Sequence, residues 1–174
     1  MSGPAYCPFY CEENIWHLAA DPRVGEGQRR VLLISNRSHR VALWGQRSGA
    51  ADTGGLVVWD YHVILTCGDG PDAVVWDLDT TLGAPVPLGP YLDQTFRGAP
   101  EPFLPMFRVI GADTFRDRFR SDRRHMRGED GAFIEPAPPW PPVGPGHTLE
   151  TWLDFECDQP GELVELPGLV ALLS

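Results

Sequence analysis

A histidine and an aspartate stand on two predicted strands that a strong turn connects. Leu56 to Cys67 and Ala73 to Leu78 are rich in β-branched and aromatic side chains, and glycine, aspartate and proline fill the segment between them. If Gly68 to Pro71 form a four-residue loop, the register places His62 directly opposite Asp77. Opposed side chains share a face with Cβ atoms about 4.5–5.5 Å apart, which allows an imidazole–carboxylate hydrogen bond. A five-residue loop would move the aspartate to the other face.

A carboxylate bonded to one ring nitrogen of a histidine fixes the tautomer and makes the ring more basic. The other nitrogen can then take a proton from a nucleophile. Cys11 is the candidate nucleophile because it opens a predicted helix from Cys11 to Ala20, where the helix dipole lowers the pKa of a thiol. Glu12 and Glu13 oppose this effect, and a nearby imidazolium would have to outweigh them. Together the cysteine, histidine and aspartate predict the chemistry of a cysteine hydrolase.

The same three residues also have simpler structural interpretations. A lone cysteine before a helix is often a small buried hydrophobe, and a histidine on an apolar strand is often a hydrogen-bonded core residue. Asp77 could instead bond backbone groups of the turn near Asp79 and Thr80. Residue types and spacing alone therefore support a Cys-His-Asp enzyme as one hypothesis, and they select no substrate.

Apolar segments on both sides of this hairpin must supply the scaffold. Further strands are predicted at Val31–Ser35, at Val41–Trp44 as its hairpin partner, and at Phe107–Ile110. Helices are predicted at Asp113–Arg120 and Leu149–Phe155, an extended loop or lid at Pro136–Pro145, and a final strand or helix at Leu163–Leu173. An antiparallel meander flanked by helices predicts an α+β fold in one domain over residues 1–174.

Composition excludes several classes of function. The formal net charge is −10, which argues against binding to nucleic acid phosphates, and the basic residues are all arginine, which excludes a Schiff-base lysine. No apolar run is long enough to span a bilayer, and the first residues lack the pattern of a signal peptide, so we expect a cytoplasmic protein. Its four cysteines, Cys7, Cys11, Cys67 and Cys157, should then be reduced, and their spacing does not favour a zinc site.

Five ordered blocks of the sequence resemble the protein N-terminal glutamine amidohydrolase family. They are YCEENIW at Tyr10–Trp16, WDYHV at Trp59–Val63, WDLDT at Trp76–Thr80, SDRRHM at Ser121–Met126 and EPAPPWP at Glu135–Pro141. The resemblance implies a fold similar to papain and transglutaminases, with Cys11 as nucleophile, His62 as base and Asp77 as the residue that orients it. The implied activity converts an N-terminal glutamine of a protein or peptide to glutamate, with release of ammonia and without a metal or organic cofactor. We expect the protein to be a monomer.

Specificity for a terminal residue requires a group that recognises a free α-ammonium, and a carboxylate is its natural partner. Glu13 and Asp122 are the candidates from sequence, although a charge at the helix start and a loop cap are equally suitable roles. A transglutaminase-like acyl transferase or a peptidase could use the same triad, and a non-catalytic binding module could retain the fold. The products formed from a peptide that begins with glutamine distinguish the enzymatic alternatives, whereas a binding module would keep its function when Cys11 is replaced by serine.

Overall fold

A six-stranded antiparallel sheet forms the centre of the fold. The computed structural model describes residues 3–156 and 159–174, so Cys157 lies outside the described residues. In spatial order the strands are β6 (Val86–Pro87), β5 (Val74–Trp76), β4 (His62–Cys67), β1 (Arg29–Ser35), β7 (Met106–Gly111) and β8 (Glu162–Glu165). A separate two-stranded sheet pairs β2 (Val41–Leu43) with β3 (Val57–Trp59).

The central strand β1 is buried on both faces, which explains its continuous apolar sequence. Successive side chains point to opposite faces of a strand. Val31 and Leu33 accordingly belong to one hydrophobic core, whereas Leu32 and Ile34 belong to another. Both faces of the sheet must therefore be covered by other elements.

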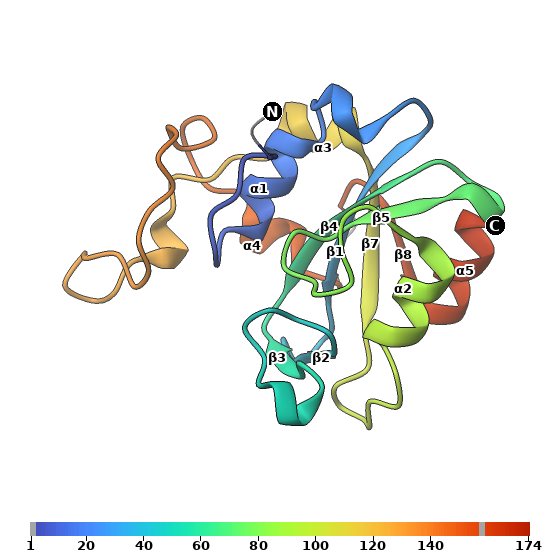
Figure 1. Ribbon diagram of the computed structural model, residues 1–174. Coiled ribbons are helices and arrows are strands. Elements are labelled where there is room, and N and C mark those ends of the chain that lie inside the picture. The colour runs from blue at the N-terminus through green and yellow to red at the C-terminus, as the bar shows by residue number, and fades with distance from the viewer. Residues whose placement is uncertain (1–2, 157–158) are drawn as a thin grey trace.

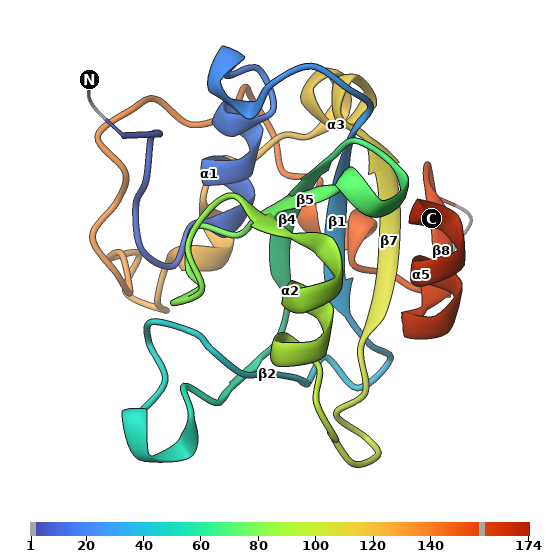
Figure 2. The same ribbon diagram turned by 45° about the vertical axis from the view of Figure 1, so that its right-hand side comes forward.

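Helices cover the two faces, as Figures 1 and 2 show. The first core contains residues of α1 (Cys11–Leu18), α3 (Ala112–Arg118) and α4 (Leu149–Trp152). The second contains residues of α2 (Leu88–Thr95) and α5 (Leu166–Leu173). Short 3₁₀ turns occur at Pro22–Val24, Ala51–Thr53, Gly70–Asp72 and Arg124–Met126. The result is a mixed α+β fold around an antiparallel sheet, as predicted, and no helix in the described part is long and apolar enough to cross a membrane.

The predicted hairpin between the strand at residues 31–35 and the segment at residues 41–44 is wrong. The two edges of β1 are already occupied, by β4 on one side and by β7 on the other. β2 has no place beside β1 and pairs with β3 instead. Asn36 stabilises the turn between β1 and β2, because its side chain accepts hydrogen bonds from the amides of Ser38 and Arg40 and donates one to the carbonyl of Arg40.

The long strand predicted from Leu56 to Cys67 is two strands, β3 and β4, separated at Asp60 and Tyr61. The Asp60 carboxylate accepts the Tyr61 N–H at 2.9 Å, which withdraws that amide from strand pairing. Helix α2 was not predicted, because Gly89 and Pro90 mark a turn in sequence. Both lie in the first turn of the helix, where backbone N–H groups have no intrahelical acceptor, so the N–H that Pro90 lacks removes no helical hydrogen bond.

The other predicted elements are close to those in the structure. They include β7, α3, α4 and the final apolar segment, which forms both β8 and α5. Residues 136–145 contain no helix or named strand. They contact the rest of the chain through an isolated bridge between Ser121 and Val143 and through hydrogen bonds of Trp140 with Glu13 and Arg123. The predicted scaffold is thus present on both sides of the hairpin that holds His62.

Candidate active site

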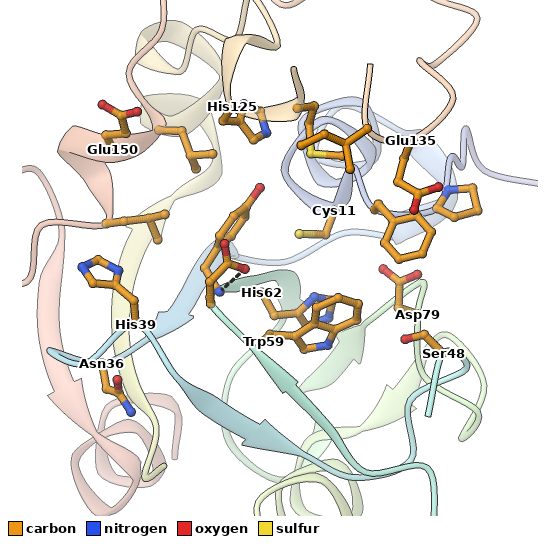
Figure 3. A pocket seen from close by; sticks show the side chains of 18 of the residues that line it. Cys11, Asn36, His39, Ser48, Trp59, His62, Asp79, His125, Glu135 and Glu150 are labelled. Carbon is orange, nitrogen blue, oxygen red and sulfur yellow. Dashed lines mark hydrogen bonds between the residues drawn. The ribbon is translucent and has the colours of Figure 1, made fainter. Parts of the chain in front are cut away.

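Helix α1 begins at the candidate nucleophile. Cys11 is its first residue, is 9% exposed, and packs in the core with Ile15 and with Val63 of β4. The Asn14 side chain clamps the chain just before the helix, since it accepts the Cys7 N–H and donates to the Cys7 carbonyl, each at 2.8 Å. Figure 3 shows the Cys11 sulfur directed into a pocket that His62 also lines. The predicted position of the cysteine at a helix start is therefore confirmed.

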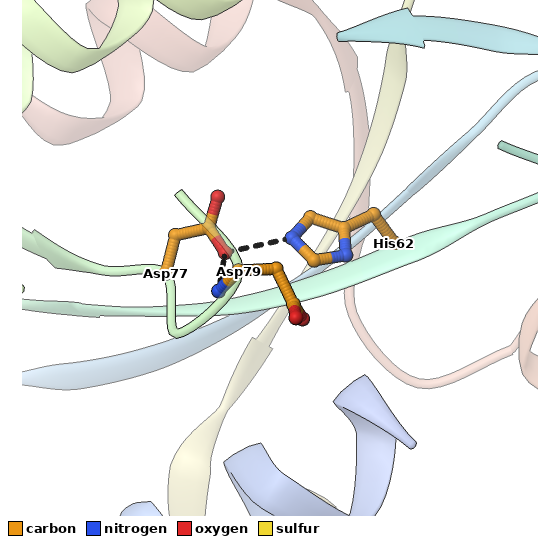
Figure 4. A group of neighbouring side chains, drawn as sticks. All are labelled: His62, Asp77 and Asp79. Atoms are coloured by element: carbon orange, nitrogen blue, oxygen red, sulfur yellow. Dashed lines mark hydrogen bonds and ion pairs between the residues drawn. The ribbon is translucent and has the colours of Figure 1, made fainter. Parts of the chain in front are cut away.

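His62 is the first residue of β4 and bonds Asp77 from the buried side of the pocket. Its Nε2 lies 2.9 Å from Asp77 Oδ1, and both side chains are almost fully buried. Figure 4 shows the other ring nitrogen on the side that faces the blue N-terminal helix. Asp77 thus holds one nitrogen of the imidazole, and the remaining nitrogen, Nδ1, is turned toward α1.

The register that predicted this contact is wrong by two residues. A four-residue loop would place Leu65 opposite Val74, whereas Leu65 pairs with Trp76. The connection is longer because a 3₁₀ turn over Gly70–Asp72 lies within it. A shift by an even number preserves the face on which each side chain lies, so Asp77 still meets the histidine, now from just beyond the end of β5.

The Asp77 carboxylate is saturated with hydrogen bonds. In addition to His62, Oδ1 accepts the Asp79 N–H at 3.0 Å, and Oδ2 accepts Gln46 Nε2 at 3.2 Å and the Tyr91 hydroxyl at 2.9 Å. Burial raises the pKa of Asp77, but the charge and hydrogen bond of His62, with these other donors, outweigh it and hold the pKa below its ordinary value. The aspartate is therefore an ionised orienting group. Gln46 and Tyr91 have no signal in sequence, because a loop and an unpredicted helix supply them.

Burial and charge give the thiol and the imidazole a defined resting state. Burial raises the pKa of Cys11, Glu12 and Asp79 raise it further, and a hydrogen bond from the Val63 backbone opposes them only in part. Burial lowers the pKa of His62, but Asp77 more than compensates, so the pKa lies above its ordinary value. The expected lowering of the thiol pKa by the helix start is therefore wrong for the resting protein. The cysteine rests as a thiol beside an imidazole of increased basicity.

The pocket is an open groove of about 1130 Å³. Near Cys11 its wall contains Trp59, His62 and Asp79. His125, which belongs to the SDRRHM block of the sequence, also lines it. The groove is large enough to hold the first residues of a peptide.

The two carboxylates expected to bind an α-ammonium lie elsewhere. Glu13 is fully buried and forms a bidentate ion pair with Arg123, with both contacts at 2.8 Å. It also accepts a hydrogen bond from the Trp140 indole N–H at 2.8 Å. Asp122 bonds Arg124 on the surface. Neither residue lines the pocket. The structure therefore contradicts a substrate-binding role for Glu13, whose oxygens are already occupied, and gives no support to one for Asp122.

Glu12 forms a second buried group beside the nucleophile. Its Oε2 accepts the Tyr61 hydroxyl at 3.1 Å and lies 3.7 Å from the Cys11 sulfur, and its Oε1 lies 3.2 Å from His125 Nε2. Glu12 is fully buried and does not line the pocket. Its charge contributes to keeping the resting thiol protonated.

The chain is similar to known proteins that are described as N-terminal glutamine amidohydrolases. The family described as N-terminal glutamine amidase matches residues 6–172. A Drosophila ananassae protein named "Protein N-terminal glutamine amidohydrolase" is 38% identical over 98% of this chain and 85% of its own length. A Drosophila melanogaster protein of the same name is 37% identical over 100% of this chain and 87% of its own length. These matches cover the pocket and every residue of the candidate site.

Proposed function

Because the chain belongs to the N-terminal glutamine amidase family, we propose that it converts the N-terminal glutamine of a protein or peptide to glutamate and releases ammonia. The observation that supports this most directly is the convergence of three distant segments. Cys11 and His62 line one pocket, and Asp77 holds the histidine from behind at 2.9 Å. The sequence blocks that contain these residues resemble motifs of the family, and we propose a papain/transglutaminase-like fold, which fits a cysteine at a helix start beside an antiparallel sheet.

In the first step the Cys11 sulfur attacks the side-chain amide carbon of the glutamine, while its proton passes to Nδ1 of His62. The carbonyl oxygen becomes an oxyanion. As the first residue of α1, Cys11 has a backbone N–H without an intrahelical acceptor, which suits it to bind that oxyanion. The carbon–nitrogen bond then breaks, the nitrogen takes the proton from His62, and ammonia leaves. A thioester to the sulfur remains.

In the second step water attacks the thioester, and His62 accepts the proton that the water loses. The carbon–sulfur bond breaks, the sulfur recovers the proton, and an N-terminal glutamate is released. Asp77 stays ionised throughout and stabilises the imidazolium formed in each step. These residues supply the nucleophile, the base and the acid, so we propose that the reaction proceeds without a metal or organic cofactor.

We further propose that the protein acts as a cytoplasmic monomer on peptide and protein termini and binds neither nucleic acid nor membranes. Three cysteines of the described part are free, which suits a reducing compartment. The net charge of −10 suits a positively charged substrate terminus and disfavours phosphate backbones. Size-exclusion chromatography with light scattering tests the monomer directly, and a dimer mass would contradict it.

Mass spectrometry of a peptide that begins with glutamine tests the reaction. The wild type should convert the terminal amide to an acid, release ammonia and leave every backbone bond intact. The Cys11→Ala variant should leave the peptide unchanged, as should the wild type with an internal glutamine or a blocked terminus. Backbone cleavage would indicate a peptidase, and transfer to an added amine would indicate an acyl transferase. Absence of any reaction in the wild type would favour a binding module.

A further inference from the structure

The proposed substrate limits where its α-ammonium can bind. Four bonds separate the α-nitrogen of glutamine from the amide carbon, so the two atoms are at most about 5 Å apart. A carboxylate that recognises a free terminus must therefore lie close to the thiol and to the imidazole. Glu13 lies outside the pocket and is occupied by Arg123, and Glu12 is bonded to Tyr61 below the pocket surface.

Asp79 satisfies this condition among the described residues. It lines the pocket, and one of its carboxylate oxygens belongs to a group of atoms, with a ring nitrogen of His62 and an oxygen of Asp77, that all lie within 4.8 Å of one another. Its charge also acts on Cys11. Figure 4 shows its carboxylate on the same side as the free ring nitrogen of His62, and Figure 3 shows it in the part of the pocket near Cys11.

One oxygen of Asp79 is held and the other is open. Tyr6 donates its hydroxyl to Oδ1 at 2.7 Å, which fixes the carboxylate. Within the described part of the chain, Oδ2 accepts no hydrogen bond, and no arginine lies within 4.0 Å of this carboxylate. The nearby Arg47 instead donates to the Thr80 carbonyl. Among the described residues, this carboxylate therefore forms no ion pair with an arginine, and His62 is its cationic neighbour when the ring is protonated.

Burial raises the pKa of Asp79, the charge of Asp77 adds to this, and the opposing effects of His62, Tyr6 and Arg47 do not offset it. A bound ammonium would supply a positive charge through a charge-assisted hydrogen bond. An internal glutamine presents a peptide bond at this place, which carries no positive charge.

We propose that Asp79, held by Tyr6, binds the α-ammonium of the substrate and so restricts the enzyme to terminal glutamine. This proposal rests on the proposed function. It adds a specificity-determining residue that does not take part in proton transfer, and it replaces the roles expected for Glu13 and Asp122.

The test compares two substrates in each variant. One is a peptide that begins with glutamine, and the other is the same peptide with hydrogen in place of the α-amino group. The ratio of their kcat/KM values cancels any effect of a substitution on the thiol or on the imidazole, since both substrates use them equally. We expect the wild type to prefer the amino substrate by about tenfold to a hundredfold, as for one charge-assisted hydrogen bond.

The Asp79→Asn variant should lose most of this preference, and Tyr6→Phe should lose part of it. Asp60→Asn is the matched control, because Asp60 also lines the pocket and acts on Cys11 but is exposed and bonds its neighbouring amide. It should keep the preference. Thermal unfolding checks that each variant is folded. If Asp79→Asn does not fold, the comparison of Tyr6→Phe with the wild type provides the test.

A folded Asp79→Asn variant with the full preference would overturn the proposal, as would an unchanged preference in Tyr6→Phe if only that variant folds. A wild type that leaves the glutamine peptide intact would instead refute the proposed function. The two failures are therefore distinguishable in the same assay.

Discussion

Replacing Glu13 with glutamine should destabilise the fold and leave substrate binding unchanged. The side chain of Arg123 is 5% exposed and that of Glu13 is fully buried, and Trp140 adds a third hydrogen bond to the pair. Removing one partner of such a buried pair costs about 3–5 kcal/mol, because the other charge remains uncompensated. Glutamine keeps the volume and one oxygen that can accept the indole N–H, which retains about 1 kcal/mol. We therefore expect the free energy of unfolding to fall by about 2–4 kcal/mol.

Urea unfolding followed by tryptophan fluorescence measures this loss, and steady-state kinetics on a glutamine peptide at low temperature measures KM. Asp122→Asn is the control, since Asp122 and Arg124 form an exposed ion pair whose loss should not move the urea midpoint. If Glu13→Gln keeps the midpoint of the wild type and raises KM, the reasoning is refuted, and Glu13 binds substrate.

Three further predictions concern the triad and the scaffold. Asp77→Asn should lower kcat/KM by about a hundredfold or more. The raised pKa of His62 keeps the ring protonated, and so unable to act as a base, up to a pH above the ordinary histidine pKa. Wild-type activity should therefore decline as the pH falls through that raised value, and in Asp77→Asn the decline should occur at lower pH. An unchanged pH profile would contradict the assignment. Tyr91→Phe removes one hydrogen-bond donor to Asp77 and should lower kcat about tenfold without changing KM. Steady-state kinetics measures both constants, and an unchanged kcat would contradict this prediction. Arg108→Met leaves three backbone carbonyls without their buried donor and should lower the free energy of unfolding by about 3 kcal/mol, and an unchanged urea midpoint would exclude this role.

The chemistry of the site could be predicted from sequence where local patterns determine it. A helix start places Cys11, and strand alternation places His62 and Asp77 on one face even though the predicted register was two residues off. A register error of one residue would have placed the two side chains on opposite faces of the sheet. The correct contact therefore depended on the length of a turn that residue spacing alone does not determine.

The rest of the site could not be predicted, because tertiary packing brings it together. Gln46 bonds Asp77 from a loop, and Tyr91 bonds it from helix α2, which was not predicted because of its glycine and proline. Glu13 has the right charge and lies beside the nucleophile, but it turns inward to Arg123, which is 110 residues away in the chain. Position along the helix therefore did not reveal which carboxylate faces the pocket.

Intact-protein mass spectrometry after rapid acid quenching tests the thioester on Cys11 most directly. Mixed with an excess of a glutamine peptide, the wild type should gain the mass of the peptide less ammonia. Cys7→Ser should gain the same mass, and Cys11→Ala should gain none. A wild type that turns the peptide over without any such adduct at any quench time, or an adduct that persists in Cys11→Ala, would contradict the account.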